Sequence, residues 1–195
     1  VFIDKILSLI CKRLPELTVT LEHITTNDAV LFIQNGNENL AATITPHHLA
    51  LNRNNLLVGG IKPHYYCLPI LKKEPHRIAL INAAISGNSK FFLGTDTAPH
   101  TLNTKENSCG CAGIFNAKYC MSVLAEIFDQ NKSISKLERF TSLNGAKHYK
   151  IKPNTEKIKM IKRTIPIEIK NKLKYGKQTI VNFNPIFPLF WEVTK

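Results

Sequence analysis

The chain has 195 residues, of which 44% are hydrophobic and 21% are charged, and its formal net charge is +12. This composition suits a globular domain with a core of its own, and no apolar run approaches the roughly 20 residues that span a bilayer. Five cysteines, with one residue between Cys109 and Cys111, favour free thiols in a reducing, cytoplasmic compartment over a disulfide framework.

Hydrophobic periodicity predicts regular elements in the first half of the chain. Apolar residues at helical spacing fill residues 1–14, and Pro15 ends that helix. Strict alternation over 17–23 predicts a strand, and Thr26 or Asn27 can cap the helix that follows it. The predicted order is helix 1–14, strand 17–23, helix 28–34, strand 40–45, a long turn-rich loop over 52–71, and helix 75–86.

The second half continues this alternation. The short apolar run 91–93, behind a Gly87-Asn88 turn, predicts a buried strand. A second long loop then extends to residue 116, and a helix follows over 117–129. A capping-box sequence at 135–138 predicts one more helix, which Asn144-Gly145 should end. Such alternation implies an α/β fold with parallel strands and crossover helices, and loops this long are usually functional.

The positive charge is concentrated near the end of the chain. Between residues 150 and 177, nine lysines and Arg163 stand against two glutamates, which gives a net charge of +8. Lysines alternate with apolar residues over 158–162, a pattern typical of a half-exposed edge strand that its lysines protect. A contact with nucleic-acid phosphates is the alternative, but no nucleic-acid-binding motif accompanies the stripe. We therefore expect a body over 1–149 and a Lys-rich tail over 150–195 that packs on it, with no nucleic-acid or membrane partner.

Histidines at strand ends are candidates for metal binding. His23 ends the first predicted strand, on the same face as Val19 and Leu21, so it is either a core histidine or a ligand. His47 and His48 follow the second strand. Because adjacent residues on a strand point to opposite faces, they can hardly bind one ion together, and we assign them no ligand role.

Asp96 follows the third predicted strand. A carboxylate at the carboxyl end of a buried strand lies where an α/β barrel has its chemistry, although a cap of a loop or helix is the alternative. Gly94 is expected to let the backbone bend before Asp96, and His100 follows four residues later. The spacing of Cys109 and Cys111 is too short for a typical structural zinc site. Their flanking small residues instead suggest a close approach of the backbone to another group.

Short segments spread along residues 1–144 resemble a known enzyme family in their order and identity. They are Glu22-His23-Ile24-Thr25-Thr26, Ala42-Thr43-Ile44-Thr45-Pro46, Asn52-Arg53-Asn54, Val58-Gly59-Gly60, Tyr66-Cys67-Leu68-Pro69-Ile70-Leu71, Leu93-Gly94-Thr95-Asp96, Ala98-Pro99-His100, Lys105-Glu106 and Ser108-Cys109-Gly110-Cys111-Ala112-Gly113. This pattern resembles the bacterial-type dihydroorotases, the short-chain, homodimeric class within the metal-dependent amidohydrolases. The resemblance fades across the Lys-rich tail.

The resemblance implies a TIM (β/α)8 barrel whose carboxyl rim binds two Zn2+ ions, bridged by a carboxylated lysine. It also implies the reversible cyclisation of N-carbamoyl-L-aspartate to L-dihydroorotate, a step of de novo pyrimidine biosynthesis. Opening an unactivated cyclic amide needs a strong nucleophile, and a metal supplies one by lowering the pKa of bound water. One carboxylate can then take a proton from that water and deliver it to the leaving nitrogen.

The family's site residues correspond to particular positions here. His23 corresponds to a zinc ligand, and Asp96 to a ligand of the other zinc that also serves as general base and acid. His100 would contact the substrate through its side chain, while Leu68 and Ala112 would contact it through their backbones. These roles would account for the two long loops and for the glycines around Ala112.

Other residues of the family's site have no counterpart in this sequence. The His-x-His pair, the bridging lysine, a further histidine and the early substrate-binding arginine and asparagine cannot be placed. We therefore expect the chain to cover roughly the last three βα units, and to be inactive and a weak zinc binder by itself. The alternatives are another cyclic amidohydrolase such as a hydantoinase or allantoinase, a non-catalytic remnant or scaffold of the same fold, and a basic nucleic-acid-binding module.

Overall fold

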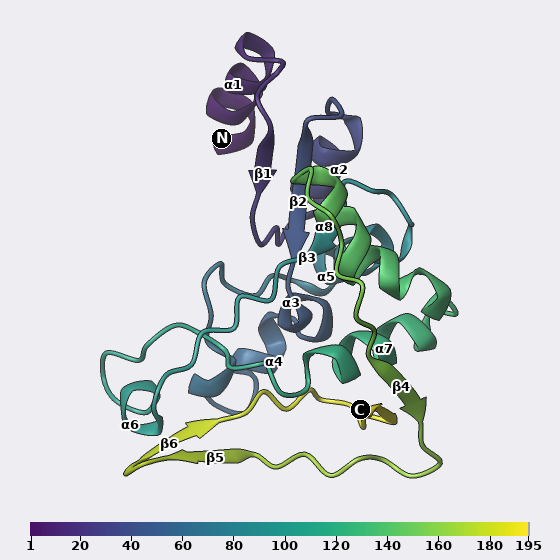
Figure 1. Cartoon of the computed structure of the whole chain (residues 1–195). Coiled ribbons are helices and arrows are strands. Elements are labelled where there is room, and N and C mark those ends of the chain that lie inside the picture. Colours follow the sequence, from purple (N-terminus) through teal and green to yellow (C-terminus); the bar gives the residue numbers. More distant parts are fainter. Residues whose placement is uncertain (195) are drawn as a thin grey trace.

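Three short parallel strands form the centre of the computed structural model, which describes residues 1–194 (Figure 1). They are β1 (Val19–Leu21), β2 (Leu40–Ile44) and β3 (Phe91–Leu93), and β2 lies between the other two. Thr20 pairs with Ala41, and Thr43 pairs with Phe92. The predicted α/β class with a parallel sheet is therefore confirmed.

The burial of the strands follows from their order in the sheet. Every residue of β2 is buried, as expected for a central parallel strand that is covered on both faces. The edge strand β1 is only half-buried along its length. One edge of β1 and one edge of β3 have no strand partner among residues 1–194.

Helices connect and cover the strands. Among residues 1–194 no helix is both long enough and apolar enough to cross a membrane. The helical segments are η1 (Ile3–Leu7), α1 (Ser8–Arg13), α2 (Asn27–Asn35), α3 (Pro46–Ala50), α4 (Arg53–Leu57), η2 (Pro63–Tyr65), α5 (Glu74–Ile85), α6 (Leu102–Lys105), α7 (Cys120–Gln130), η3 (Ile134–Lys136), η4 (Arg139–Leu143) and α8 (Asn144–His148).

Most of the predicted helices are confirmed. The helix predicted over 1–14 is present as η1 and α1, although much of its apolar face is exposed. Thr26 caps α2 by accepting a hydrogen bond from the Ala29 amide, which settles the choice between the two candidate caps. The helix predicted over 75–86 is α5, and Gly87 follows it with a φ of 80°.

Two long segments that the sequence predicts as loops contain short helices. The segment 52–71 includes α4 and η2, and the segment up to residue 116 includes α6. Asn52 begins α4 with a reciprocal capping box to Asn55, and Pro63 lies in the first turn of η2. These helices are only three to five residues long, so they leave too little periodicity to detect in the sequence.

The helix predicted to run from residue 135 to Asn144-Gly145 is wrong in its details. The segment is a 3-10 turn, a π-helical turn and then α8, which begins at Asn144 and continues to His148. Asn144 is buried, and its side-chain amide donates to the Phe91 carbonyl. A Cβ on Gly145 would lie 3.1 Å from the Phe92 ring. These two residues therefore serve the close packing of the helix on β3 instead of ending it.

The tail forms two antiparallel ribbons along one side of the body (Figure 1). β4 (Lys159–Lys162) pairs with β7 (Trp191–Thr194), and β5 (Lys172–Tyr175) pairs with β6 (Gln178–Val181). The exposed lysines at both ends of β4 agree with the predicted edge strand. Phe183 and Leu189 anchor the tail, because both are buried in the core of the chain.

Candidate functional site

The carboxyl ends of the three parallel strands bring the candidate residues to one edge of the sheet. His23 lies two residues beyond β1, α3 follows β2 directly, and Asp96 lies three residues beyond β3. His23 and Asp96 both adopt positive φ values, 53° and 43°. Such values are uncommon outside glycine, and strained backbone of this kind clusters at functional sites. Both predicted metal ligands therefore share one edge and one unusual backbone conformation.

Thr43, on the central strand, holds His23 in place. Its hydroxyl oxygen accepts a hydrogen bond from the His23 amide at 2.7 Å and lies 3.2 Å from Nδ1 of the ring. A Cβ on Gly94 would lie 2.6 Å from the Cβ of Thr43. Gly94 has no positive φ, so its role is to leave room for Thr43, and the bend predicted there is not the reason for the glycine.

The atoms at this edge fit two ligands of a zinc site. The Thr43 hydroxyl oxygen has a lone pair for the Nδ1–H of His23, which leaves Nε2, 3.9 Å from the Glu22 carboxylate, as the atom for a metal. In the described part of the chain, no hydrogen bond reaches the Asp96 carboxylate, so both of its oxygens are available. Zinc takes three or four protein ligands, so further ligands would have to come from other residues.

The Asp96 carboxyl group lies in a partly desolvated environment. Burial raises its pKa, the neighbouring His23 lowers it, and Glu22 raises it again. A carboxylate whose pKa is raised accepts a proton more readily than an ordinary surface carboxylate. Its environment therefore suits the general base and acid role that the sequence predicts.

His47, to which the sequence pattern assigns no ligand role, is a neighbour of Asp96. The pair His47-His48 lies on α3, not on the end of a strand, so the argument from alternating strand faces does not apply. His47 is fully buried, and its Nε2 lies 3.8 Å from Oδ2 of Asp96 without a hydrogen-bond partner. The signal that predicts the helix is Thr45-Pro46, an N-cap followed by proline at the first helical position.

His47 is oriented from its other side. Asn116 donates from Nδ2 to the Thr95 carbonyl at 2.7 Å, which fixes the direction of its amide. The same Nδ2 lies 3.3 Å from Nδ1 of His47 and donates to it. Nδ1 is then an acceptor, so the ring proton is on Nε2, the atom that faces Asp96.

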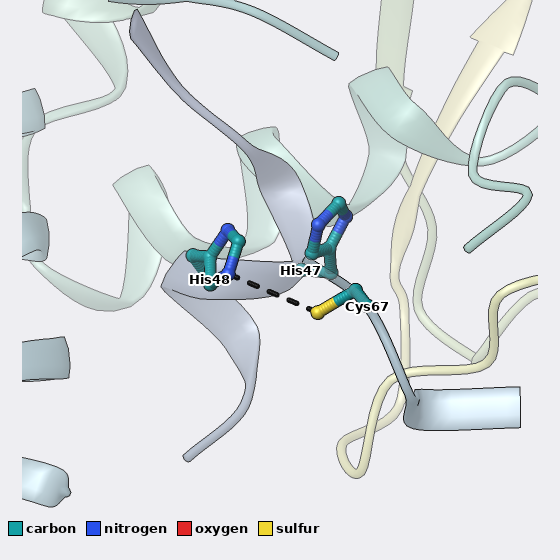
Figure 2. A group of neighbouring side chains, drawn as sticks. All are labelled: His47, His48 and Cys67. Carbon is teal, nitrogen blue, oxygen red and sulfur yellow. Dashed lines mark hydrogen bonds between the residues drawn. The ribbon is translucent and has the colours of Figure 1, made fainter. Parts of the chain in front are cut away.

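His47, His48 and Cys67 form a buried group whose ligand atoms lie within 4.8 Å of one another (Figure 2). His48 nevertheless uses both ring nitrogens, because Nδ1 lies 2.7 Å from the Thr45 hydroxyl and Nε2 lies 2.7 Å from the Pro69 carbonyl. Burial raises the pKa of the Cys67 thiol to about 12, whereas a metal binds the thiolate. The group is therefore better explained as a hydrogen-bonded part of the core than as a metal site.

The predicted substrate-contacting residues lie on segments that are joined to each other. The Gly113 amide donates to the Tyr66 carbonyl at 2.9 Å, which links the segment before Leu68 to the segment that carries Ala112. Gly113 has a φ of 145°, and a Cβ there would lie 2.8 Å from the His100 ring. The close approach that the small residues suggest is present at Gly113. The structure thus groups the segments that carry Leu68, His100 and Ala112.

Comparison with known proteins gives a consistent result. A sequence profile of the amidohydrolase family matches residues 11–164. A dihydroorotase of Rhizobium rhizogenes is 51% identical over 99% of the chain, which spans 56% of that relative. A dihydroorotase structure from Campylobacter jejuni superposes on 98% of the chain with a TM-score of 0.86 and 33% identity, and the match covers 55% of that structure. A dihydroorotase structure from Saccharomyces cerevisiae, in complex with 5-fluoroorotic acid, superposes on 96% of the chain with a TM-score of 0.85 and 29% identity. This match covers 54% of that structure. The chain spans about half the length of the curated relatives that it matches.

Proposed function

The chain belongs to the amidohydrolase family, and we propose that it is the C-terminal part of a dihydroorotase. The activity is the reversible cyclisation of N-carbamoyl-L-aspartate to L-dihydroorotate in pyrimidine biosynthesis. The observation that carries this proposal is that His23 and Asp96 lie at the same edge of the sheet, in a chain about 50% identical to dihydroorotases.

We propose that His23 and Asp96 are ligands of two different zinc ions. A lysine carboxylated on its amine, outside this sequence, would bridge the two ions, as in the family that the sequence resembles. The bound metals would supply water of lowered pKa and would polarise the ring carbonyl. Thr43 holds His23 for this task through one hydrogen bond from the backbone amide and one contact with the ring.

Asp96 moves the proton in this proposal. During ring opening its carboxylate accepts the proton of the attacking water, and the carboxylic acid returns it to the leaving nitrogen. During ring closure the same carboxylate accepts the proton of the carbamoyl nitrogen. The burial that raises the pKa of Asp96 supports its use as a base, because a partly desolvated carboxylate accepts a proton more readily than one in water.

The remaining contacts would orient the substrate. His100 would bind it through the ring, and Leu68 and Ala112 would bind it through backbone groups. Leu68 is largely exposed and His100 is half-buried, so both can be reached by a ligand from solvent.

Surfaces of the described chain support completion by residues outside this sequence. The outer edge of β1 has no strand partner among residues 1–194, and Phe2, Ile6 and Leu14 of the N-terminal helical segment are exposed. In a (β/α)8 barrel every strand has two neighbours. We propose that residues 1–149 are the C-terminal part of such a barrel, that residues 150–195 are a tail packed on it, and that the complete enzyme is a cytoplasmic homodimer.

Reconstitution tests this proposal. The chain is fused to, or co-expressed with, the part of the Agrobacterium fabrum dihydroorotase that it does not cover, and conversion of L-dihydroorotate to N-carbamoyl-L-aspartate is measured with added zinc. We expect turnover and zinc binding by the assembled protein and neither by either part alone. Turnover by the chain alone would contradict the proposal that the active site needs residues from both parts. A folded, zinc-loaded assembly without turnover would favour a non-catalytic remnant, and turnover of hydantoin alone would favour the hydantoinase alternative.

A further inference from the structure

Lys105, the last residue of α6, is a buried cation held by three backbone carbonyls. It is 4% exposed, and its Nζ donates to the carbonyl oxygens of Tyr66 at 2.9 Å, Cys111 at 2.8 Å and Gly113 at 2.7 Å. An ammonium group has three N–H donors, so all three are used. Its position is therefore fixed by geometry from three directions.

The charge of Lys105 has no carboxylate partner in the described part of the chain. The next residue, Glu106, pairs with His64 at 2.7 Å instead. Burial of an ammonium is costly unless hydrogen bonds compensate for the lost water, and here three carbonyls do so, with the centroid of the Tyr66 ring 5.9 Å from Nζ. A surface lysine would contribute to solubility without this cost, so the burial calls for a role.

The three carbonyls belong to the two segments that the proposed function assigns to the substrate. Cys111 and Gly113 are the two neighbours of Ala112, so Lys105 holds the peptide group before Ala112 and the carbonyl of the residue after it. Tyr66 lies two residues before Leu68, and its carbonyl also accepts the Gly113 amide. One ammonium group thus fixes the main chain of both segments and their distance from each other.

We propose that Lys105 is a positioning residue, which sets the backbone of Leu68 and Ala112 for substrate binding and has no part in the chemical step. This inference rests on the proposed function, because it depends on these two backbones meeting the substrate. A side chain that acts only through such backbone contacts should affect the Michaelis constant, KM, far more than kcat.

The chain offers a matched control in Lys90, the other buried lysine among residues 1–194. Lys90 is 9% exposed and donates to the Gly36 carbonyl at 2.6 Å, at the amino end of β3, away from the candidate site. Lys90→Met and Lys105→Met remove the same charge from comparable burial. A difference between them therefore reports the location and not the general cost of losing a buried lysine.

The experiment uses the assembled enzyme with L-dihydroorotate. For Lys105→Met we expect KM to rise about 10- to 100-fold while kcat stays within about threefold, and for Lys90→Met we expect an unchanged KM. Lys105→Arg keeps the charge, but the larger, planar guanidinium cannot meet the same three carbonyls, so its KM should be intermediate; this variant is used if Lys105→Met does not fold. An unchanged KM in a folded Lys105 variant would overturn the inference.

A second readout does not depend on activity. Amide hydrogen exchange of Gly113 is compared in the wild-type assembly and in the two methionine variants. We expect faster exchange, by about tenfold or more, in Lys105→Met only, because the segment around Ala112 loses two of its carbonyl contacts. If the wild-type assembly lacks turnover, the proposed function fails, but this measurement still tests whether Lys105 holds the segment around Ala112. Equal exchange of the Gly113 amide in all three proteins would refute that role.

Discussion

The carboxyl edge of the parallel sheet and the Lys-rich tail use charged residues in opposite ways. In the segments that follow β2 and β3, His47 and Lys105 are buried, with carbonyls, amides or a nearby carboxylate as neighbours. In the tail, Lys162 and Arg163 are half-exposed and form ion pairs with Asp129 and Glu192. Buried polar groups carry large penalties if their partners are lost, whereas exposed ion pairs contribute little. The difference teaches that sensitivity to substitution should follow burial and not the number of charges.

The largest effect is expected at Asp96. Asp96→Asn in the assembled enzyme removes the group that moves the proton, so kcat should fall by roughly 10²- to 10⁴-fold. Steady-state turnover of L-dihydroorotate, with zinc content measured on the same sample, checks this. Activity within tenfold of wild type at full zinc occupancy would remove Asp96 from the proposed chemistry.

The second effect is loss of stability in acid. Burial lowers the pKa of His48 from 6.5 to about 4. Between these two pH values His48 therefore binds a proton in the unfolded chain but not in the folded chain. The contribution of the neutral His48 to the free energy of unfolding is therefore complete above pH 6.5. It is lost as the pH falls toward 4, an effect of about 3 kcal/mol. Urea unfolding at several pH values compares wild type with His48→Gln, which cannot titrate. If the free energy of unfolding of the two proteins depended equally on pH across this range, the prediction would be contradicted.

A third effect separates the crowded edge from the open tail. Gly94→Ala places a Cβ 2.6 Å from Thr43, so it should cost about 1–3 kcal/mol of unfolding free energy. Gly176→Ala lies in the β5–β6 turn, where a Cβ meets no atom within 4 Å and only a φ of 58° disfavours it. Its cost should be about 1 kcal/mol. Urea unfolding measures both, and a larger loss for the tail variant than for Gly94→Ala would contradict the comparison.

The smallest effect is expected in the tail. Glu192→Gln removes the exposed ion pair with Arg163, and the free energy of unfolding should change by less than about 1 kcal/mol. Thermal unfolding at low and high salt provides the measurement, and KM and kcat of the assembled enzyme should be unaltered. A loss as large as that of Gly94→Ala would show that the tail is as sensitive as the sheet edge.

The sequence alone determined the elements whose physical cause is local. Pro75 and Gly87 delimit α5, apolar patterns predict the three parallel strands, and Thr26 or Asn27 can cap α2, because these signals act between residues close in the chain. Position after a buried strand singles out Asp96 and His23 in the same way. The family resemblance added Leu68 and Ala112, which no periodicity indicates.

Only the tertiary structure decided the rest, because the causes lie far apart in the chain. Gly145 permits contact with Phe92 and continues a helix that its sequence predicts to end. Gly94 makes room for Thr43, and three carbonyls from two loops surround Lys105. A lysine or glycine has the same local pattern whether it serves a turn, a surface or a buried contact. Which of these it serves depends on what the fold brings beside it.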